Sequence, residues 1–483
     1  MTMNDVDSTR QNMYSQLAAI VRRKPVVVGP EVSVHDALRV MDEARVGSLV
    51  ITDAASGKPL GVFTLRDLLT RVALGSWDRE QPISAVMSSH NLVALGEQAT
   101  AYQAALIMAK HRLRHLLVTD ANGALQGVVS QDDLYALRHA GVKEVSGEIR
   151  DASDLDSLRQ AASGIARLAE RMLAQGTGAE TLTQFISSLN DILTLRVIEL
   201  TLPGYELPAV DWCWIALGSE GRFEQTFSTD QDNGIIFDCP AGMSPDSLRL
   251  AFLPFAQEVN RKLDACGFPL CKGNIMAGNA QWCLALGEWR ALFSGWIHEA
   301  QPLALLNASI FFDFRPLYGE EGLSQQLREF LLSITTANPL FLRQMAVNAL
   351  QCNPPLGLIR TFVYDSDQFP HTIDLKMYGS RPFVDAARIF ALASGIGDTG
   401  TAQRLRAAAE ALQFHQEDVS ALVDSFYFIQ LLRLRNQHPG RLDPRLANRV
   451  DPSQLNGLDR QTLKHAFRQA KKLQQKLVLD YRL

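Results

Sequence analysis

A repeated motif constrains the fold of the N-terminal third of this chain more than any other feature of the sequence. Residues 47–53 (GSLVITD) are followed by residues 61–67 (GVFTLRD), and the same pattern returns at 114–120 (RHLLVTD) and 127–133 (GVVSQDD). The two closing segments begin at Gly61 and Gly127, 66 residues apart. Similar segments at a fixed interval indicate two copies of one structural unit.

Each copy is expected to contain a helix, a strand, a turn, a second strand and a second helix. In the first copy, Ser33 followed by Asp36 is typical of a helix N-terminus. The apolar residues after it recur at helical spacing, at Leu38, Met41 and Val46. The short apolar runs 49–51 and 62–63 predict buried strands, and residues 56–57 (SG) predict the turn between them.

This arrangement resembles a tandem CBS pair, or Bateman module, over residues 21–140. The resemblance rests on the repeated closing motif: a glycine, two apolar residues, a Ser or Thr, and an Asp three positions later. In that family the hydroxyl and the carboxylate commonly contact the phosphate and ribose of an adenosine nucleotide, which implies an adenine nucleotide as partner. The ligand-binding residues implied here are Thr64, Asp67, Ser130 and Asp133. Alternatively, Thr64 and Ser130 only cap the following helices. Such pairs commonly associate face to face, which implies a homodimer.

Two amphipathic helices are expected after a polar link at about 143–156. The apolar face of the first carries Leu155, Leu158, Ile165, Leu168 and Met172, and that of the second carries Leu182, Phe185, Leu189, Ile192 and Leu193. Gly176 and Gly178 supply the break between them. We therefore assign residues 1–20 to an N-terminal extension and residues 141–200 to a linker and helical hairpin.

The segment 212–237 carries the most informative chemical pattern of the chain. An apolar run (WCWIAL) precedes GSEGRFE, and TDQDN precedes a second apolar run (GIIF). These runs predict a strand, a tight turn at Gly218 and Ser219 into a helix, a loop, and a second strand. Residues two apart in an extended strand face the same side, so Asp230 and Asp232 are expected to present both carboxylates to one point.

Paired carboxylates of this kind predict a cation site. Hard oxygen ligands suit Mg²⁺, which binds proteins through one or two carboxylates and then through substrate phosphates. The backbone N–H groups of Gly218 and Ser219, at the start of a helix, are a suitable seat for a phosphate. Arg222 adds a guanidinium from the same turn. The implied ligand is a nucleoside triphosphate with its magnesium ion.

A third carboxylate is required if two metal ions are to activate an attacking oxygen and hold the leaving pyrophosphate. Asp313 is the best candidate, within residues 309–315 (SIFFDFR). Alternation along a central strand would place Phe312 and Phe314 on one side and Asp313 with Arg315 on the other. The alternative is a surface pair of Asp313 with Arg315 on an edge strand. We predict catalytic and metal-binding roles for Asp230, Asp232 and Asp313.

At these residues the chain resembles the nucleotidyltransferase superfamily, whose pattern is an apolar residue, Gly-Ser and a later D-x-D. The run GSEGRFE followed by TDQDN is similar to the version found in PII uridylyltransferases and glutamine-synthetase adenylyltransferases. More closely, the chain resembles bacterial signal-transduction proteins that join CBS domains to a PII-uridylyltransferase-like domain and a helical substrate-binding-like domain. Residues 311–319 (FFDFRPLYG) fit the second block of that group. The resemblance implies an α+β multidomain chain with a polymerase-beta-like α/β core over 201–324.

The C-terminal residues 325–483 are expected to form an all-helical domain, because helical periodicity marks residues 405–412, 419–434 and 463–479. Lys376 and Arg381 lie near a glycine there, with Asp385 and Arg388 following on an expected helix. This set indicates the wall of a nucleotide cleft, although structural salt bridges explain it equally well. Lys272, in the segment 267–277 that is expected to form two strands around a Gly-Asn turn, is a further nucleotide contact or a surface lysine.

The composition fits a globular protein of about three domains. Hydrophobic residues make up 47% of the 483, and the net charge of -5 does not favour nucleic acid or an anionic membrane as partner. Six scattered cysteines form no CxxC pair, which argues against a zinc site and a disulfide framework. No stretch approaches the roughly 18 apolar residues that span a bilayer. We therefore expect a cytoplasmic location.

Together these features predict a magnesium-dependent nucleotidyltransferase. It would transfer a nucleoside monophosphate from ATP or UTP to a hydroxyl of a protein or small molecule, under the control of adenine nucleotides at the CBS pair. The alternative is a non-catalytic nucleotide sensor that keeps the fold for binding and signals through its conformation. The intact carboxylates and Gly-Ser turn favour catalysis.

Overall fold

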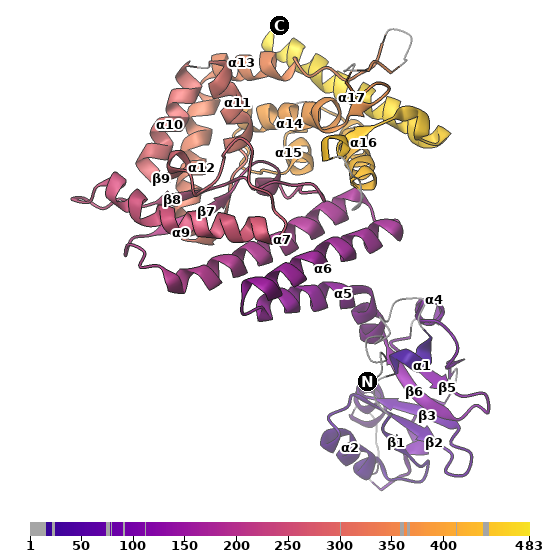
Figure 1. Cartoon of the computed structure of the whole chain (residues 1–483). Coiled ribbons are helices and arrows are strands. Elements are labelled where there is room, and N and C mark those ends of the chain that lie inside the picture. Colours follow the sequence, from indigo (N-terminus) through magenta and orange to yellow (C-terminus); the bar gives the residue numbers. More distant parts are fainter. Residues whose placement is uncertain are drawn as a thin grey trace, which may run out of the picture. The chain divides into compact units, whose positions relative to one another are not determined.

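The computed structural model divides the chain into two compact units, Met1–Glu144 and Val145–Leu483 (Figure 1). We describe each unit by itself. The expected N-terminal extension lies largely outside the described residues. The structure describes residues 16–21, 25–73, 78, 80–89, 92–111, 113–299, 301–357, 362–364, 368–411, 413–437 and 444–483.

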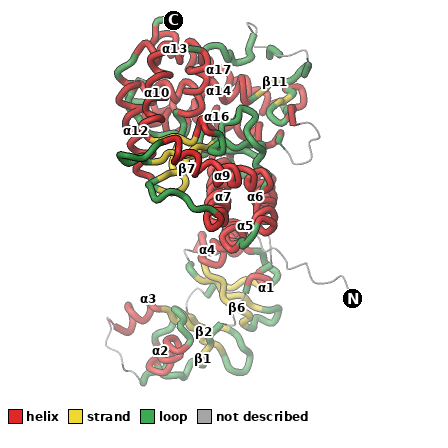
Figure 2. The backbone as a smooth tube through the Cα atoms, turned by 60° about the vertical axis from the view of Figure 1, so that its left-hand side comes forward, coloured by secondary structure: helices red, strands yellow, loops and turns green. Residues whose placement is uncertain are grey.

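The first unit contains the two expected copies of one α/β element, each with a three-stranded sheet (Figure 2). The first copy comprises β1 (Val27–Val28), α2 (Val34–Glu43), β2 (Ser48–Thr52), β3 (Pro59–Thr64) and α3 (Leu65–Asp67), which continues as the π-helix η1 (Leu68–Ala73). The second comprises α1 (Leu17–Ile20), β4 (Ala94–Gly96), α4 (Ala101–His111), β5 (His115–Thr119), β6 (Leu125–Ser130) and the start of α5 (Gln131–Asp151).

Strand register confirms the duplication. Val50 pairs with Val62 in the first copy, and Leu117 pairs with Val128 in the second. Each antiparallel pair has an irregularity near its turn, after Ile51 in one and after Val118 in the other. The predicted cap at the start of α2 is also confirmed, because the Ser33 side chain accepts a hydrogen bond from the backbone of Asp36 at 3.1 Å.

Two predicted boundaries are displaced. Leu17 and Ile20 are buried in the core of the second copy, so that copy includes residues before the expected boundary at 21. The expected polar link at 143–156 is wrong for most of its length, since α5 continues to Asp151. Its polar residues lie on a helix that buries Val145 and Ile149, and charged residues on the other face of a helix do not break it.

The helical hairpin is confirmed at the start of the second unit. It consists of α6 (Leu155–Ala174) and α7 (Ala179–Thr201), which pack against each other. Asp154 caps α6 by accepting a hydrogen bond from the backbone of Ser157 at 2.8 Å. The break falls where it was expected, because Gly176 has a φ of 83° and Gly178 is the N-cap of α7.

A four-stranded sheet forms the centre of the second unit, in the order β10-β7-β8-β9. The strands are β7 (Trp212–Ala216), β8 (Asn233–Phe237), β9 (Cys283–Ala285) and β10 (Arg315–Gly319). Only β8 and β9 run parallel; β7 is antiparallel to both its neighbours. The predicted strands around the Gly-Ser turn are confirmed as β7 and β8, and β8 is buried at every residue.

Helices cover this sheet from both sides. In Figures 1 and 2 the sheet lies between the C-terminal helices and the hairpin with α9 (Pro245–Ala265). The other helices are α10 (Leu286–Glu299), α11 (Pro302–Phe311), α12 (Glu321–Thr336), α13 (Pro339–Ala349), α14 (Arg381–Ala393), α15 (Thr401–Ala407), α16 (Gln416–Asn436) and α17 (Gly457–Tyr481). Short elements are α8 (Gly218–Gly221), β11 (Ile373–Asp374), β12 (Arg449–Val450), the π-helix η5 (Lys376–Ser380) and several single 3-10 turns.

One hydrophobic core joins the sheet to the C-terminal helices. It runs from Ile215 and Ile236 in the sheet, through Phe312, to Phe390 and Leu473 in the helices. The predominantly helical character of residues 325–483 is confirmed, with only β11 and β12 as extended elements among the described residues. The expected boundary between 324 and 325 therefore does not separate two cores. None of the described helices is long and apolar enough to cross a membrane.

Candidate functional site

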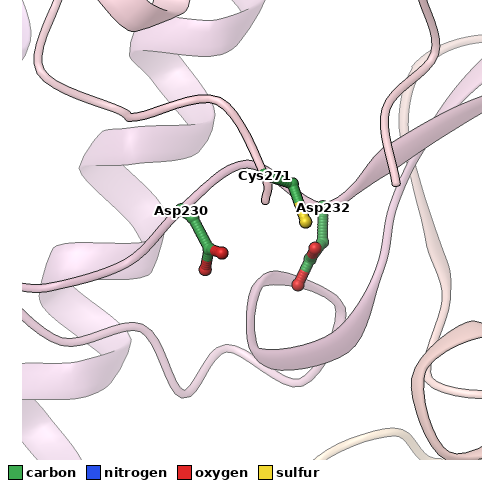
Figure 3. Close-up of side chains that lie close together, drawn as sticks. All are labelled: Asp230, Asp232 and Cys271. Carbon is green, nitrogen blue, oxygen red and sulfur yellow. The ribbon is translucent and has the colours of Figure 1, made fainter. Parts of the chain in front are cut away.

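Two carboxylates converge in the loop that leads into β8. One oxygen of Asp230, one oxygen of Asp232 and the sulfur of Cys271 all lie within 4.8 Å of one another. Figure 3 shows the two carboxylates on the same side of the loop, with the Cys271 sulfur beside the Asp232 side chain. The predicted convergence of Asp230 and Asp232 is therefore confirmed, although both lie just before the strand rather than within it.

The backbone around these carboxylates is held from both sides. Leu217 donates a hydrogen bond to the carbonyl of Asp232 at 2.9 Å, which extends the pairing of β7 with β8. Between the two aspartates, Gln231 is buried, and its amide donates to the carbonyls of Asn260 and Phe268 at 3.0 and 2.7 Å. Because Gln231 is anchored inside, both neighbouring carboxylates face the other way.

The Gly218-Ser219 turn lies directly against this pair. Gly218 has a φ of 56°, and a Cβ added to it would meet the Asp232 carboxylate at 3.0 Å. The helix that follows, α8, is a single turn of 4 residues rather than a full helix. Glycine is therefore required at position 218 both for its backbone conformation and for the close approach of Asp232.

Electrostatics at the pair favour a cation. Burial and then the charge of Asp230 raise the pKa of Asp232 to about 6, against the opposing effects of a Cys271 hydrogen bond, Lys376 and Arg222. Burial and the charge of Asp232 raise the pKa of the Cys271 thiol to about 11, so the thiol stays protonated at neutral pH. The donor set for a hard cation is therefore the two carboxylates, which fit Mg²⁺.

The expected strand at 309–315 is wrong. Residues up to Phe311 belong to α11, Asp313 lies in the turn that follows, and β10 begins only at Arg315. Moreover, β10 is an edge strand of the sheet, not a central one. Phe312 and Phe314 are both buried, so the apolar residues around Asp313 reflect a buried helix end, which has the same composition as a buried strand.

Asp313 is also not part of the acidic cluster. It is fully buried, and four N–H groups occupy both its oxygens. Arg388 donates to Oδ1 at 3.0 Å and to Oδ2 at 2.6 Å, Arg404 to Oδ1 at 2.6 Å, and Arg222 to Oδ2 at 2.7 Å. Burial alone would raise the pKa of Asp313, but the three guanidinium charges hold it well below its usual range. The structure therefore assigns it to a buried ion cluster and corrects its predicted role as a metal ligand.

Other residues that are predicted to bind the nucleotide form ion pairs in or beside this cluster. Arg222 also binds Glu224 at 2.7 Å, so its guanidinium is shared by two carboxylates instead of facing outward for a phosphate. Arg381 pairs with Asp385 at 3.2 Å, and Arg388 pairs with the other oxygen of Asp385 at 2.7 Å. For these residues, structural salt bridges are therefore the better explanation.

Lys272 and Lys376 have exposed side chains, and no ion pair involves either lysine among the residues that the structure describes. The segment 267–277 contains no strand, contrary to expectation; it is a series of turns. This segment contributes two groups to the site: Cys271, which lies beside Asp232, and the Ile275 carbonyl, which accepts a hydrogen bond from the backbone of Asn233 at 3.2 Å.

The closing motifs of the first unit share one geometry and differ in exposure. Thr64 and Ser130 each cap the following helix, and each hydroxyl donates to the carboxylate three residues on, at 2.7 Å. Asp67 is buried, and its second oxygen is bound by Ser88 at 2.9 Å and lies 3.5 Å from Arg71. Asp133 is exposed. Both hydroxyls therefore cap helices, and Asp133 is the more accessible carboxylate.

Replacing Gly221 with alanine is expected to destabilise the second unit by about 1–3 kcal/mol, the usual range for overpacking. An added Cβ would lie 1.9 Å from the Asp313 carbonyl oxygen, and backbone must move to admit it. Gly295→Ala is the matched control: position 295 is inside α10 with nothing within 4 Å, so the change should stabilise by about 0.5–1 kcal/mol. Urea unfolding measures both; a neutral Gly221→Ala would show that the turn adapts.

Family models match three parts of the chain: the N-terminal repeat, the region of the acidic cluster and the C-terminal helices. CBS domain models match residues 17–74 and 83–139. A model described as "Putative nucleotidyltransferase DUF294" matches residues 163–303, and one described as "Putative nucleotidyltransferase substrate binding domain" matches residues 339–481. The DUF294 match spans both aspartates of the cluster, and the match to the substrate binding domain spans Lys376, Arg388 and Arg404.

Curated and solved relatives cover about a quarter of the chain. An uncharacterized 17.7 kDa protein of Acidianus ambivalens is 31% identical over 122 residues, which are 25% of this chain and 72% of that protein. A CBS-domain protein of known structure from Agrobacterium tumefaciens is 32% identical, covering 26% of this chain and 99% of that one, with a TM-score of 0.23. A CBS domain protein from Pyrobaculum aerophilum, complexed with AMP, is 27% identical, covering 25% and 89%, with a TM-score of 0.23.

The order of the matched domains agrees with the repeat, the acidic cluster and the C-terminal helices described above. The chain therefore belongs to the proteins that combine a CBS domain pair with the two domains described as "Putative nucleotidyltransferase DUF294" and "Putative nucleotidyltransferase substrate binding domain".

Proposed function

We propose that this protein is a magnesium-dependent nucleotidyltransferase that transfers a nucleoside monophosphate from ATP or UTP to a hydroxyl of a protein or a small molecule. The observation that carries the proposal is the convergence of Asp230 and Asp232 directly against the Gly218-Ser219 turn. In the transfer, the acceptor hydroxyl loses its proton to water, its oxygen forms a bond to the α-phosphorus, the bond from that phosphorus to the bridging oxygen breaks, and pyrophosphate leaves.

Each part of the site has a role in this reaction. A bound Mg²⁺ would supply positive charge for the α-phosphate and the leaving pyrophosphate. Asp230 and Asp232 would hold that ion, and the backbone N–H groups of Gly218 and Ser219 would bind phosphate oxygens. Lys376, whose charge acts on Asp232, adds a cation from the C-terminal helices. The buried anchor at Gln231 keeps both carboxylates in place.

One observation favours a second function, a non-catalytic nucleotide sensor. The third member of the acidic cluster among the described residues is the thiol of Cys271, and Asp313 is occupied by three arginines. A two-metal reaction needs a further carboxylate to help activate the attacking oxygen. A site with two aspartates still binds a metal–triphosphate complex, so binding without transfer is the rival.

Mass spectrometry separates these two functions. Purified protein, Mg²⁺ and labelled ATP or UTP are incubated with cell extract, and every protein and metabolite is searched for an added nucleoside monophosphate. An adduct that requires both Mg²⁺ and intact Asp232 supports transfer and identifies the acceptor. Tight magnesium-dependent nucleotide binding with no adduct, and no release of pyrophosphate, supports the sensor and contradicts the enzyme.

Regulation by adenine nucleotides is proposed to depend on Asp133 more than on Asp67. Asp133 is exposed, whereas Asp67 is committed to Ser88 and Arg71. We expect Asp133→Ala in the full-length protein to weaken AMP binding by about tenfold, the usual cost of a lost hydrogen bond to a charged group. Asp67→Ala should mainly lower the thermal midpoint. Isothermal titration calorimetry with AMP measures the first effect; equal AMP affinity for both variants and the parent would remove these motifs from ligand binding.

The oligomer and the location complete the proposal. Leu65 and Leu69 are 59% and 58% exposed on α3 and η1, and Leu106 is 53% exposed on α4. Such apolar helix faces suit a homodimer formed through the CBS pair. All six cysteines are free thiols, which fits the reducing cytoplasm. Light scattering of the purified protein tests the dimer, and a monomeric mass across micromolar concentrations would contradict it.

A further inference from the structure

Arg433 is a buried cation that forms no ion pair with a carboxylate of the residues that the structure describes. It lies on α16 with 7% of its surface exposed. Its guanidinium donates to the side-chain oxygens of Asn448 and Gln430, at 3.0 and 2.5 Å. Within the described part of the chain, no ion pair involves Arg433. A buried charge without a counter-ion is costly, and a guanidinium has five N–H donors, so this group has capacity for an anion.

A chain of amides connects Arg433 to the acidic loop. Gln437 donates to Asn448, the same oxygen that Arg433 binds, at 2.9 Å. The Gln437 side-chain oxygen in turn accepts a hydrogen bond from the backbone of Ser228 at 3.4 Å. Ser228 precedes Asp230 by two residues. The C-terminal end of α16 and the loop that carries the carboxylates are therefore neighbours, although they are about 200 residues apart in sequence.

The charge of Arg433 is influenced by groups of both matched regions, Asp374 on one and Glu224 and Arg222 on the other. Burial lowers the pKa of Arg433 to about 10, while the charges of Asp374 and Glu224 oppose this shift and that of Arg222 adds to it. The group is thus protonated at neutral pH. α16 also packs against η5, which carries Lys376.

Lys376 is the second cation of this region without an ion pair in the described residues. Its side chain is exposed, and its charge lowers the pKa of Asp232. The other arginines nearby have partners, since Arg222, Arg388 and Arg404 bind Asp313. Lys376 thus acts on the paired carboxylates through its charge, and Arg433 is connected to their loop through Asn448, Gln437 and the backbone of Ser228.

We propose that Arg433 and Lys376 bind the terminal phosphates of the nucleoside triphosphate, so that the C-terminal helices hold the pyrophosphate that leaves. The identity of the ligand as a nucleoside triphosphate rests on the proposed function. The anion site itself does not, because a guanidinium fork and an ammonium match any polyphosphate, which carries several negative charges and many acceptor oxygens. The free pyrophosphate ion and the end of a triphosphate share this chemistry.

Binding of inorganic pyrophosphate to the full-length protein, in the presence of a chelator that removes divalent cations, tests the anion site alone. We expect Arg433→Gln to weaken pyrophosphate binding by at least tenfold in calorimetry, because charge-assisted hydrogen bonds are lost. Lys376→Ala should weaken it several-fold, since it removes one exposed cation. Arg433→Lys should recover part of the loss, because it keeps the charge without the fork.

Arg435→Gln is the matched control. Arg435 lies on the same helix, is 49% exposed, and pairs with Asp459 at 3.3 Å. The change removes the same charge two residues away and should alter pyrophosphate affinity by less than twofold. Thermal midpoints without ligand report whether each variant folds. Lys376→Ala, at an exposed position, keeps the test decisive if Arg433→Gln fails to fold.

Two results would overturn the proposal. One is unchanged pyrophosphate affinity in folded Arg433→Gln and Lys376→Ala variants. The other is an equal loss in Arg433→Gln and Arg435→Gln, which would indicate a general effect of net charge. Failure of the proposed function looks different: triphosphate turnover would be absent from the parent protein, yet pyrophosphate would still bind and Arg433→Gln would still weaken it. If Arg433→Gln weakens the binding of the triphosphate by the same factor as the binding of pyrophosphate, the result would support a shared site.

Discussion

Asp232→Asn is expected to abolish magnesium-dependent use of a nucleoside triphosphate, with a loss of about 10³-fold or more in turnover. The substitution removes one of the two charges that would hold the metal ion, and the stabilisation such an ion gives to the reacting phosphates amounts to several kcal/mol. Release of labelled pyrophosphate from ATP or UTP, in the presence of the identified acceptor, measures the effect. Asp230→Asn should behave in the same way.

The variant should remain folded and become slightly more stable without metal. The raised pKa of Asp232, about 6, means that its ionised form is disfavoured in the folded state. Above that pH the carboxylate therefore costs stability, and the uncharged amide removes the cost. We expect a higher thermal midpoint at pH 7.5 without Mg²⁺, and the loss of any further increase when Mg²⁺ and triphosphate are added.

Asp238→Asn is the control for this prediction. Asp238 follows β8 directly and is exposed, so the change removes the same charge six residues from Asp232 without touching the cluster. Its turnover and its response to Mg²⁺ should match those of the parent. Normal turnover in Asp232→Asn would remove the acidic cluster from the mechanism, and inactivity in both variants would point to net charge or to the fold.

Features that depend on local sequence could be predicted. The CBS repeat follows from its closing motif at a fixed interval, and both copies show the equivalent antiparallel strand pair. The convergence of Asp230 and Asp232 needs only their spacing of two in extended backbone. The turn at Gly218 needs only the residue types that permit it.

Features that depend on contacts between distant residues could not be predicted from the sequence. The sequence around Asp313 is apolar on both sides, a pattern that a buried helix end and a buried strand share. Its partners Arg388 and Arg404 lie on helices 75 and 91 residues further on. Nothing in the sequence points to Cys271 as a neighbour of Asp232, because its place there is set by the fold of a loop without regular structure.

Asp313 occupies the junction between the two regions that the family models describe separately. It lies between residues 303 and 339, where the first match ends and the second begins. Arg222 reaches it from the first region, and Arg388 and Arg404 reach it from the second. Together with the shared hydrophobic core, this cluster makes the two regions one structural unit, in which Gln437 at the end of α16 contacts the acidic loop at Ser228.

Asp313→Asn is accordingly expected to destabilise the second unit by about 3–5 kcal/mol, the cost of removing one partner from a buried ion pair. Three guanidinium groups would remain in a site with 0% exposure and lose their shared charge, while an amide nitrogen would replace one acceptor oxygen. Urea unfolding followed by tryptophan fluorescence measures the loss, since Trp214 and Trp289 lie in this unit. Asp459→Asn, which breaks the exposed pair with Arg435, should cost less than about 1 kcal/mol.

The same measurement separates this role from the catalytic one that the sequence indicates. If Asp313 held a metal ion, Asp313→Asn would keep the stability of the parent and lose turnover as Asp232→Asn does. If it joins the two regions, the variant should unfold at a lower urea concentration, and its remaining folded fraction should still bind triphosphate through Asp230 and Asp232. Because Arg388 makes two of the four bonds to Asp313, Arg388→Gln should show the larger loss of stability among the three arginine variants. A loss of turnover without any loss of stability would return Asp313 to the catalytic site.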